Sequence, residues 1–372
     1  MIRVLNVISD RNIGGAGRCI LNFLAHYDRS AFQVDVALPR GSLLAAEVRK
    51  LDTRVLAVDG LGDRSFSFDA VRALRAVIRE TEPSVVHTHG AMSGRIAARQ
   101  CGRAVVYTRH SVFPVNRRIA RQPIKFLHGR VNEYYADAIL AVAEAARENL
   151  VDAGVRAERV QVILNGVPGQ VRLSEAEILA ERAGYGIAPA QFVVGILARL
   201  EPVKGHSYLL EAVRQLKERG HPITLLVAGA GGELASLQRQ AEALGISDAV
   251  VFAGFVPDVP RLLSILDIQV NASYGTEATS LSLLEGMSMG IPAVVTDYGG
   301  NPGVIQSEEN GLLVQTCDSA ALAQGIERML TDAAGRKKMA GRCLEIFAEK
   351  FTADIYARNI EQVYRNVAGK RG

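Results

Sequence analysis

Two series of short β-branched runs, each followed by an amphipathic stretch of helical length, occupy most of the sequence and limit the folds that it can adopt. The first series runs through RVLNVIS, FQVDVAL, TRVLAV, SVVHTH, AVVYTRH and VQVILNGVP. The second runs through QFVVGILARL, ITLLVAGAG, AVVFAGF, DIQVNAS, PAVVTD and GLLVQT. Strands that alternate with helices of this length form parallel βαβ units. The sequence therefore predicts an α/β protein with two doubly wound, Rossmann-like sheets.

The length of the chain and one segment that reads as a linker predict two domains. A chain of 372 residues is longer than the number of residues that usually fold around a single hydrophobic core. Residues 166–174 contain Gly, Pro and Ser and are the best linker candidate, and Ser174 with Glu177 matches a capping box that opens a new helix. We expect domains over residues 1–168 and 169–350. Parallel sheets bind ligands at the carboxyl ends of their strands, so two facing domains are expected to form a cleft.

The last stretch, TADIYARNIEQVYRNV, predicts a helix over residues 352–368. Its apolar side chains share one helical face and are Tyr356, Ile360, Val363, Tyr364 and Val367. This face must pack against another element.

The net charge of +4 is divided unevenly along the chain. Residues 1–168 contain 24 Lys and Arg against 16 Asp and Glu, a charge of +8, and the remainder contains 19 against 23, a charge of −4. A basic first half predicts a partner or substrate with negative charge.

Composition argues against several classes of protein. The four cysteines, Cys19, Cys101, Cys317 and Cys343, are dispersed with no CxxC or Cys/His spacing, so we expect reduced thiols and no zinc site. The longest uncharged runs fall short of the roughly 18–20 residues that span a bilayer. The first residues lack a basic leader before an apolar stretch. These features predict a cytoplasmic protein.

The segment YGTEATSLSLLEGMSMGIPAVVTDYGG carries the strongest chemical signal. Glu277 lies in a loop after a strand, and we expect a helix to begin near Thr279. The backbone N–H groups around Ser280 and Leu281 would suit a phosphate, and Glu285 could accept hydrogen bonds from ribose hydroxyls. Two surface acids in a helical region are the alternative.

A second signal is GILARLEPVKGH, in which Arg199 follows a strand and Lys204 comes five residues later. Two cations at the carboxyl end of a strand can neutralise a diphosphate and stabilise it as a leaving group. A solvated loop with ordinary charges is the alternative for this motif taken alone.

Together these strings resemble the retaining glycosyltransferases of the GT-B fold, in family 4 (glycosyl transferases group 1). The matching strings are IGGAGR, VVHTHG, YTRH, ILNGVP, LARLEPVKG, GAGGEL, FAGFV, EATSLSLLE, GMSMGIPAVV and a final GG. They occur in the family's order over nearly the whole chain, and the combination is specific although each string alone is weak. The resemblance implies a first, acceptor-side domain, a second domain that binds the nucleotide sugar, and a C-terminal helix that crosses back to the first.

The resemblance also implies roles for single residues of the second domain. Arg199 and Lys204 resemble the diphosphate clamp. Glu285 resembles the ribose ligand, and Glu277 resembles the carboxylate that holds hydroxyls of the donor sugar. Around them, Gly229 would allow close backbone approach to the nucleotide.

Further residues complete the predicted site. Gly231 is expected to act as Gly229 does, with an ordinary tight turn as the alternative for both. In the first domain, Gly14 and Gly15 correspond to the glycine loop under the donor phosphates, and His110 corresponds to the histidine beside the transferred sugar.

Other residues carry weaker signals. His87 and His89 follow a strand and could line the acceptor side, but a structural histidine is the commoner outcome. Residues 165–166 match the family's inter-domain turn. Two departures from the commonest pattern, residues 278–280 after the first acid and Asn301-Pro302 after the final GG, leave the donor sugar and part of the acceptor geometry open.

Family resemblance further implies a hexosyl transfer that retains anomeric configuration without an assigned covalent nucleophile. We expect no metal and no cofactor, a UDP-sugar donor in preference to a GDP-sugar, and a sugar or lipid-linked acceptor in cell-surface polysaccharide or glycolipid synthesis. No nucleic-acid partner is expected. The alternatives are a nucleotide-sugar epimerase of the same shape and a non-catalytic nucleotide-sugar binding protein.

A dinucleotide-dependent oxidoreductase is a more distant alternative. Gly15-Ala-Gly17 after the first strand, with Asp35 twenty residues past Gly15, loosely matches a Rossmann fingerprint. The third glycine position is Ile20, and this alternative leaves the pair of acids unexplained.

The segment VFPVNRRIARQPIKFLHGR interleaves cations with apolar residues. The cations are Arg117, Arg118, Arg121, Lys125 and Arg130, and the apolar residues are Val115, Ile119, Ile124, Phe126 and Leu127. This pattern predicts contact with an anionic membrane surface, at the inner face of the membrane, or with a lipid-linked acceptor. A solvated helix with one core face is the alternative.

Overall fold

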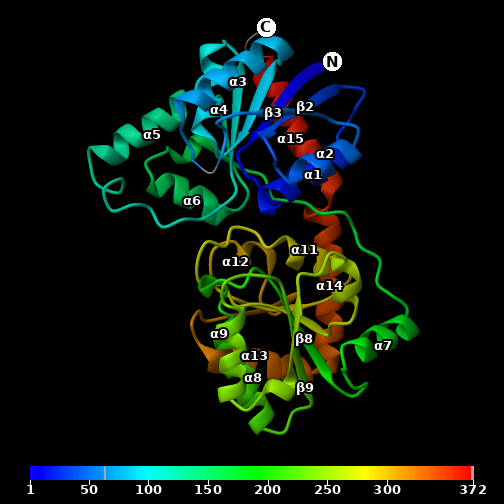
Figure 1. Cartoon of the computed structure of the whole chain (residues 1–372). Helices are drawn as coiled ribbons and strands as arrows, with labels where there is room; N and C mark the ends of the chain where they lie inside the picture. The colour runs from blue at the N-terminus through cyan, green and yellow to red at the C-terminus, as the bar shows by residue number, and fades with distance from the viewer. Residues whose placement is uncertain (63, 370–372) are drawn as a thin grey trace. The chain divides into compact units, whose positions relative to one another are not determined.

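A computed structural model describes residues 1–62 and 64–369 of the chain (Figure 1). Its contacts divide the chain into two compact units. Unit 1 comprises Met1–Pro168 and the chain from Phe351 onward, and unit 2 comprises Gly169–Lys350.

Unit 1 is built on a parallel sheet, which has seven strands within the described residues, in the order β3-β2-β1-β4-β5-β6-β7. Val4 pairs with Val34 on one side and with Val85 on the other, so β1 lies in the middle of the sheet. The strands are β1 (Ile2–Ile8), β2 (Phe32–Pro39), β3 (Arg54–Val58), β4 (Val85–His89), β5 (Ala104–Arg109), β6 (Ala138–Ala141) and β7 (Val160–Val162). The helices are α1 (Gly15–His26), α2 (Leu44–Lys50), α3 (Phe68–Thr81), α4 (Met92–Gln100), α5 (Ile124–Tyr134), α6 (Glu144–Asp152) and α15 (Ala353–Ala368).

Helix α15 belongs to unit 1 although it lies at the end of the chain. The chain returns to this unit beside Val167, whose N–H donates to Phe351 O and whose carbonyl accepts from Ala353 N, each at 2.9 Å. The helix packs against α1 and the sheet. The five apolar residues predicted to share a face, from Tyr356 to Val367, are all buried. The expectation that this helix crosses back to the first domain is confirmed.

Unit 2 contains a second parallel sheet, of six strands within the described residues, in the order β10-β9-β8-β11-β12-β13. The strands are β8 (Phe192–Leu197), β9 (Ile223–Ala228), β10 (Val250–Gly254), β11 (Ile268–Asn271), β12 (Ala293–Thr296) and β13 (Gly311–Val314). The helices are α7 (Glu175–Gly184), α8 (His206–Glu218), α9 (Leu234–Ala243), α10 (Val259–Ser264), α11 (Leu281–Met287), α12 (Asn301–Val304), α13 (Ser319–Thr331) and α14 (Ala333–Lys350).

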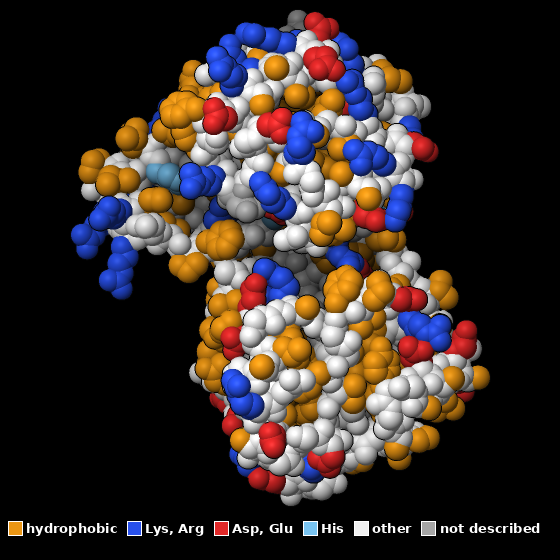
Figure 2. All heavy atoms as spheres, viewed as in Figure 1, with side chains coloured by type: hydrophobic (Ala, Val, Ile, Leu, Met, Phe, Trp, Pro, Cys, Tyr) orange, Lys and Arg blue, Asp and Glu red, His pale blue; other side chains and the backbone are white. Residues whose placement is uncertain are grey.

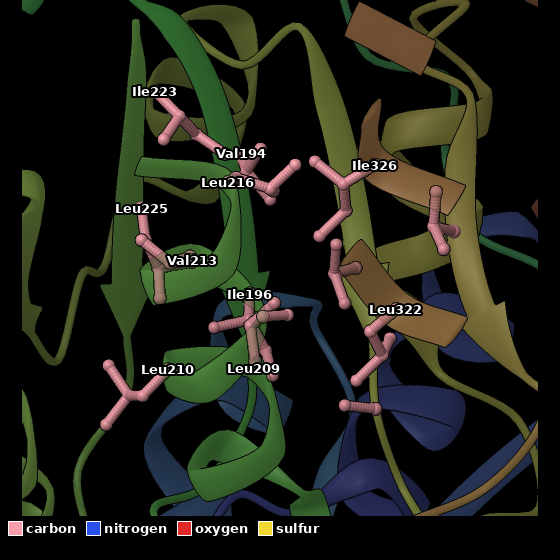
Figure 3. Packing of buried hydrophobic residues seen from close by; sticks show 14 of the residues in the cluster. Val194, Ile196, Leu209, Leu210, Val213, Leu216, Ile223, Leu225, Leu322 and Ile326 are labelled. Atoms are coloured by element: carbon pink, nitrogen blue, oxygen red, sulfur yellow. The ribbon is translucent and has the colours of Figure 1, made fainter. Parts of the chain in front are cut away.

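The core of unit 2 forms where α8 and α13 pack on β8 and β9. Figure 3 shows Val194 of β8 beside Leu216 of α8 and Ile196 of β8 beside Leu209 of α8, with Ile326 of α13 on the other side. Strands buried on both faces read as nearly continuous apolar runs, which is why QFVVGILARL and ITLLVAGAG predicted them.

Both sheets are doubly wound, as the sequence predicted. The strand order reverses between β1 and β4 in unit 1 and between β8 and β11 in unit 2. Loops that leave neighbouring strands in opposite directions open a crevice at such a point, where α/β sheets bind their ligands. We therefore expect ligand-binding residues in the loops that follow these four strands.

The predicted boundaries of single helices can be compared with those in the structure. The predicted capping box is present, since Ser174 Oγ accepts from Glu177 N while the Glu177 carboxylate accepts from Ser174 N. Helix α11 begins at Leu281, two residues later than expected. Helices α13 and α14 lie in a part of the sequence for which we predicted no element.

Candidate functional site

A buried ion pair joins the two loops that flank the reversal of strand order in unit 2. Lys204 follows β8, and its Nζ donates to Glu277 Oε2 at 2.8 Å. Glu277 lies in the loop after β11. Only 12% of the Lys204 side chain and 9% of the Glu277 side chain are exposed. Low exposure strengthens the attraction between the two charges.

The Glu277 carboxylate is held from one side. Its Oε2 also accepts from Ser273 Oγ at 3.2 Å and from Asn271 Nδ2 at 3.4 Å. For Oε1, no hydrogen bond is formed to any part of the chain that the structure describes. The carboxylate is therefore fixed in orientation while one of its oxygens remains available to a ligand hydroxyl.

The backbone ties these two loops together. Tyr274 N donates to Val203 O at 2.9 Å, which links the loop after β11 to the turn that ends at Lys204. Gly205 follows this turn with φ at +72°, and a side chain there would collide with the carbonyl oxygen of Ala272. The close approach of the two loops therefore requires glycine at this position.

Arg199, the other predicted cation, has a different environment. It follows β8, its side chain is 71% exposed, and its Nη1 pairs with Glu201 Oε1 at 2.7 Å. Arg199 thus lies on the same loop as Lys204, but it is solvated and pairs with a near neighbour in sequence.

The two predicted glycines of unit 2 support this loop. A Cβ on Gly229 would collide with the carbonyl oxygen of Ala198, and a Cβ on Gly231 would collide with that of Leu200. The segment after β9 therefore packs directly against the backbone on either side of Arg199. This contact within the chain accounts for glycine at both positions.

Helix α11 carries the remaining predicted residues of unit 2. Ser280 precedes its first residue, Leu281, and Ser280 Oγ is hydrogen-bonded to Ser282 Oγ at 3.0 Å. Glu285 lies one turn further along and is half-buried. Leu283, Leu284 and Met287 form the buried side of the helix.

One residue of this site was missed by the sequence analysis. His206 directly follows Gly205 and is buried, and neither ring nitrogen has a hydrogen-bond partner among the described residues. Burial, together with the positive charge of Lys204, lowers the pKa of His206 to about 4. A histidine next to a strongly predicted cation was the available signal.

In unit 1, His110 belongs to a buried hydrogen-bonded chain. His110 Nε2 lies 2.8 Å from His89 Nδ1, and His89 Nε2 lies 3.0 Å from Asn6 Oδ1. An amide oxygen only accepts hydrogen bonds, so His89 carries its hydrogen on Nε2 and accepts from His110 through Nδ1. A neutral His110 then presents an unprotonated Nδ1, which is buried and has no partner among the described residues.

Burial keeps these rings neutral. It lowers the pKa of His110 to about 4, and it lowers the pKa of His89 well below 6.5, with further lowering by the charges of His87 and His110. His87 has both nitrogens engaged, Nδ1 with Tyr364 OH and Nε2 with Thr108 Oγ1, each at 2.7 Å. His87 thus ties β4 to α15, as a structural histidine would.

The predicted glycine loop lies at the start of α1. Gly14 precedes the helix and Gly15 is its first residue, and both are exposed. A Cβ on Gly15 would meet nothing within 4 Å, and one on Gly14 would lie 3.7 Å from the Asp10 carboxylate. The space above the first turn of the helix is therefore open at Gly15, whereas Gly14 lies beside Asp10.

The basic segment of unit 1 exposes apolar side chains together with its cations. Figure 2 shows orange and blue spheres side by side over α5 and the loop before it. The exposed apolar residues are Phe113, Ile124, Phe126, Leu127, Val131 and Tyr134. Helix α5 does have a core face, which includes Gly129 and Asn132.

Two wider features of the described residues bear on function. They contain no group of three or more His, Cys, Asp or Glu residues arranged to hold a metal ion. None of the helices formed by residues 1–62 and 64–369 combines the length and apolar character needed to cross a membrane.

Comparison with known protein families gives consistent matches over both units. Residues 13–170 match the model of glycosyltransferase family 4, and residues 177–342 match the model of glycosyl transferases group 1. EpsD of Bacillus subtilis, which is named as a glycosyltransferase, is 31% identical over 273 residues, which cover 69% of this chain and 70% of that protein. The D-inositol 3-phosphate glycosyltransferase of Salinispora tropica is 29% identical, covering 81% of this chain and 67% of that protein.

Solved structures show the same architecture. The crystal structure of Anabaena HepE in complex with UDP has a TM-score of 0.85 at 23% identity and covers 98% of this chain and 100% of that one. WaaG, a glycosyltransferase involved in lipopolysaccharide biosynthesis, has a TM-score of 0.70 at 16% identity, with 98% and 100% covered. At these identities the likeness establishes the fold, which is GT-B.

Proposed function

Since the chain belongs to the glycosyltransferases with family 4 and group 1 domains, we propose that it transfers a hexosyl group from a nucleoside diphosphate sugar to an acceptor hydroxyl, with retention of anomeric configuration. The observation that carries this proposal is the buried Lys204–Glu277 pair at the strand-order reversal of unit 2. It combines a cation for a diphosphate with a carboxylate for sugar hydroxyls at the place where an α/β sheet binds its ligand.

Lys204 neutralises the diphosphate of the donor. An ammonium group has three donor hydrogens, and one of them is used by Glu277, so the other two can bind phosphate oxygens. Arg199 is the second cation, and it exchanges its exposed pair with Glu201 for the diphosphate. Together they stabilise the charge that develops on the leaving group.

Glu277 holds the donor sugar through Oε1. Lys204, Ser273 and Asn271 fix the opposite oxygen, so the carboxylate is oriented before a ligand arrives. Glu285 accepts from the ribose hydroxyls, and the backbone at Ser280 and Leu281 faces the phosphates. A preorganised negative charge beside the ring stabilises an oxocarbenium-like transition state.

Gly229 and Gly231 act by supporting the cation-bearing loop. Their lack of side chains lets the segment after β9 pack against Ala198 and Leu200, which fixes the backbone from which Arg199 projects. Because neither glycine has a side chain, the nucleotide can also approach the backbone of this segment closely.

Unit 1 supplies the acceptor side. His110 lies beside the transferred sugar, and its hydrogen bond with His89, which is held in turn by Asn6, fixes the orientation of its ring. Gly14 and Gly15 form the loop under the donor phosphates, and Gly15 leaves open space above the first turn of α1. The acceptor proton passes to a phosphate oxygen of the leaving group, and no divalent metal takes part.

UDP is the favoured nucleotide. Crystal structures of HepE, which shares the fold, hold UDP and UDP-glucose, and this supports UDP over GDP. The acceptor is a sugar or a lipid-linked sugar of a cell-surface polysaccharide or glycolipid.

The exposed surface over α5 contacts an anionic membrane at its inner face. It combines the exposed apolar residues from Phe113 to Tyr134 with Arg117, Arg118, Arg121, Lys125 and Arg130. Apolar side chains enter the interface while cations remain near the lipid headgroups. This placement brings the enzyme to a lipid-linked acceptor.

A thermal-shift panel of UDP-, GDP-, ADP- and TDP-sugars tests the donor proposal. A ligand present at about 100 times its dissociation constant stabilises the folded state by about 2.7 kcal/mol. We expect a UDP-sugar to raise the melting temperature, and Lys204→Ala to abolish the rise. No stabilisation by any member of the panel would reject the proposed donor site.

A further inference from the structure

Unit 1 contains a cavity of about 300 Å³ that the proposed donor site does not use. This volume is at the lower end of the range found for small-molecule sites. The polar side chains that line it include Arg95, Arg109, His128, Asn132 and Asn149. None of the described lining residues is acidic.

Arg95 of α4 is the more deeply buried of the two cations, with 3% of its surface exposed. Its guanidinium lies over the ring of Tyr107, 4.0 Å from the ring centroid, and its Nη1 donates to Asn132 Oδ1 at 2.9 Å. Its Nε has no partner among the described residues. The contacts of this buried cation are thus a neutral amide and an aromatic ring.

Arg109, at the end of β5, has the same kind of environment. Its Nη2 donates to Asn149 Oδ1 at 3.0 Å, and its guanidinium lies 5.3 Å from the ring centroid of Phe113. Its Nε is also buried without a partner among the described residues. Two arginines therefore line one cavity, and the described groups that contact their guanidiniums are neutral.

This arrangement is costly without a ligand. Burial lowers the pKa of Arg95, the Tyr107 hydroxyl opposes this effect, and the positive charge of Arg109 lowers the pKa further. A guanidinium nevertheless stays protonated in proteins, so it cannot relieve the cost by losing its proton. Buried charges are normally paired, and an anion in the cavity would pair both.

We propose that this cavity binds a phosphate group of the acceptor substrate, an inference that rests on the proposed glycosyl transfer. Guanidinium groups bind phosphate through two parallel hydrogen bonds, and Arg95 and Arg109 both line the cavity. Two cations match the double negative charge of a phosphomonoester or a diphosphate. A single carboxylate would leave one cation unmatched.

The position of the cavity supports a ligand that is part of the acceptor. Arg109 directly precedes His110, and Gly90, which lines the cavity, directly follows His89. Phe113 lines the cavity and is also part of the exposed surface over α5. A phosphate held here would belong to a water-soluble sugar phosphate or to the head of a lipid diphosphate, and the chemistry of the site is the same for both.

Calorimetric titration of the full chain with inorganic pyrophosphate tests the proposal. Arg109→Gln and Ile119→Glu alter the cavity in different ways, because the first removes a cation and the second introduces a carboxylate into its lining. Arg72→Gln is the control, since Arg72 is exposed on α3 and its loss removes the same charge. Pyrophosphate must be added with UDP present, so that binding in unit 2 is excluded.

We expect both cavity variants to weaken pyrophosphate binding at least about tenfold, with the control unchanged. Equal affinity in all four proteins, or loss in the control as well, would overturn the assignment. The affinity for UDP should be the same in the wild type, the two cavity variants and the control. If the wild type binds no nucleoside diphosphate, the proposed function fails, whereas the pyrophosphate titration still decides the cavity.

Two further arms identify the source of the phosphate. A hexose phosphate and a short-chain polyprenyl diphosphate sugar, the latter in detergent, are compared as competitors of pyrophosphate and as acceptors. If either compound competes with pyrophosphate, and Arg109→Gln weakens that competition, the acceptor carries a phosphate group. Failure of both to compete, with transfer to neutral sugars unaffected by Arg109→Gln, would overturn it.

Discussion

The Nζ atom of Lys204 donates a 2.8 Å hydrogen bond to Oε2 of Glu277, 73 residues further along the chain. Both side chains are nearly buried, so each charge depends on the other. The same two residues are proposed to bind different parts of the donor. Stability and activity are therefore linked at this point, and experiments must separate them.

Removal of Lys204 should affect the stability of the protein as well as its activity. Lys204→Ala leaves the Glu277 carboxylate buried without its cation, and loss of one partner of a buried pair costs about 3 kcal/mol of unfolding free energy. Arg199→Ala removes an exposed pair and should cost less than about 1 kcal/mol. Urea denaturation of both variants measures the difference. Equal losses would show that the pair is not buried in solution.

Glu277→Gln and Glu285→Gln should change different kinetic and binding constants. Glu285 is proposed to contact ribose, which is unchanged during reaction, so Glu285→Gln should raise KM and weaken UDP binding with little effect on kcat. Glu277 is proposed to lie beside the reacting ring, so Glu277→Gln should lower kcat strongly. Melting curves must first establish that both variants fold. Equal loss of UDP affinity in the two variants would contradict this division.

Acid should destabilise the protein partly through His206. Its pKa is lowered from 6.5 to about 4 in the folded chain, so between these values the unfolded chain binds a proton that the folded chain does not. The unfolding free energy therefore falls as pH decreases through this range, by about 2 kcal/mol at pH 5 for this one group. Urea midpoints of wild type and His206→Asn at pH 7.5 and pH 5 measure it. A pH-dependent loss that is the same in both proteins would be evidence against this assignment.

The surface over α5 should bind anionic vesicles through its apolar side chains. Leu127→Glu replaces a leucine that is 63% exposed on α5, and Leu43→Glu replaces one that is 62% exposed elsewhere in unit 1. Co-sedimentation with vesicles of anionic lipid at low salt should be lost only for Leu127→Glu. Absence of wild-type binding, or equal loss in both variants, would leave α5 as an ordinary solvated helix.

The fold could be predicted because its signals are local. Most strands of the two sheets are short runs rich in apolar residues. Capping and packing signals lie within one element, as Ser174 with Glu177 and the buried face of α15 illustrate. The missed helix α13 carries a comparable signal, since Leu322, Ile326 and Met329 are spaced as a buried helical face. That spacing could have identified it.

The candidate site was predictable only in part because its contacts depend on strand order. Lys204 meets Glu277 because β8 and β11 are neighbours, and His89 meets His110 because β4 pairs with β5. The sequence contains neither pairing directly. The cavity depends in the same way on α4 and β5, because Arg95 and Arg109 come from these two elements.

The configuration of the sugar released from the donor tests the central claim most directly. Time-resolved proton NMR of wild type with UDP-, GDP-, ADP- and TDP-sugars, with a chelator present and water as acceptor, reports the anomer before mutarotation. We predict release of the retained anomer from a UDP-sugar, with the rate cut at least about a hundredfold in Lys204→Ala, the order of loss for one preorganised donor. An inverted product, no release from any donor, or dependence on added manganese or magnesium would contradict the account.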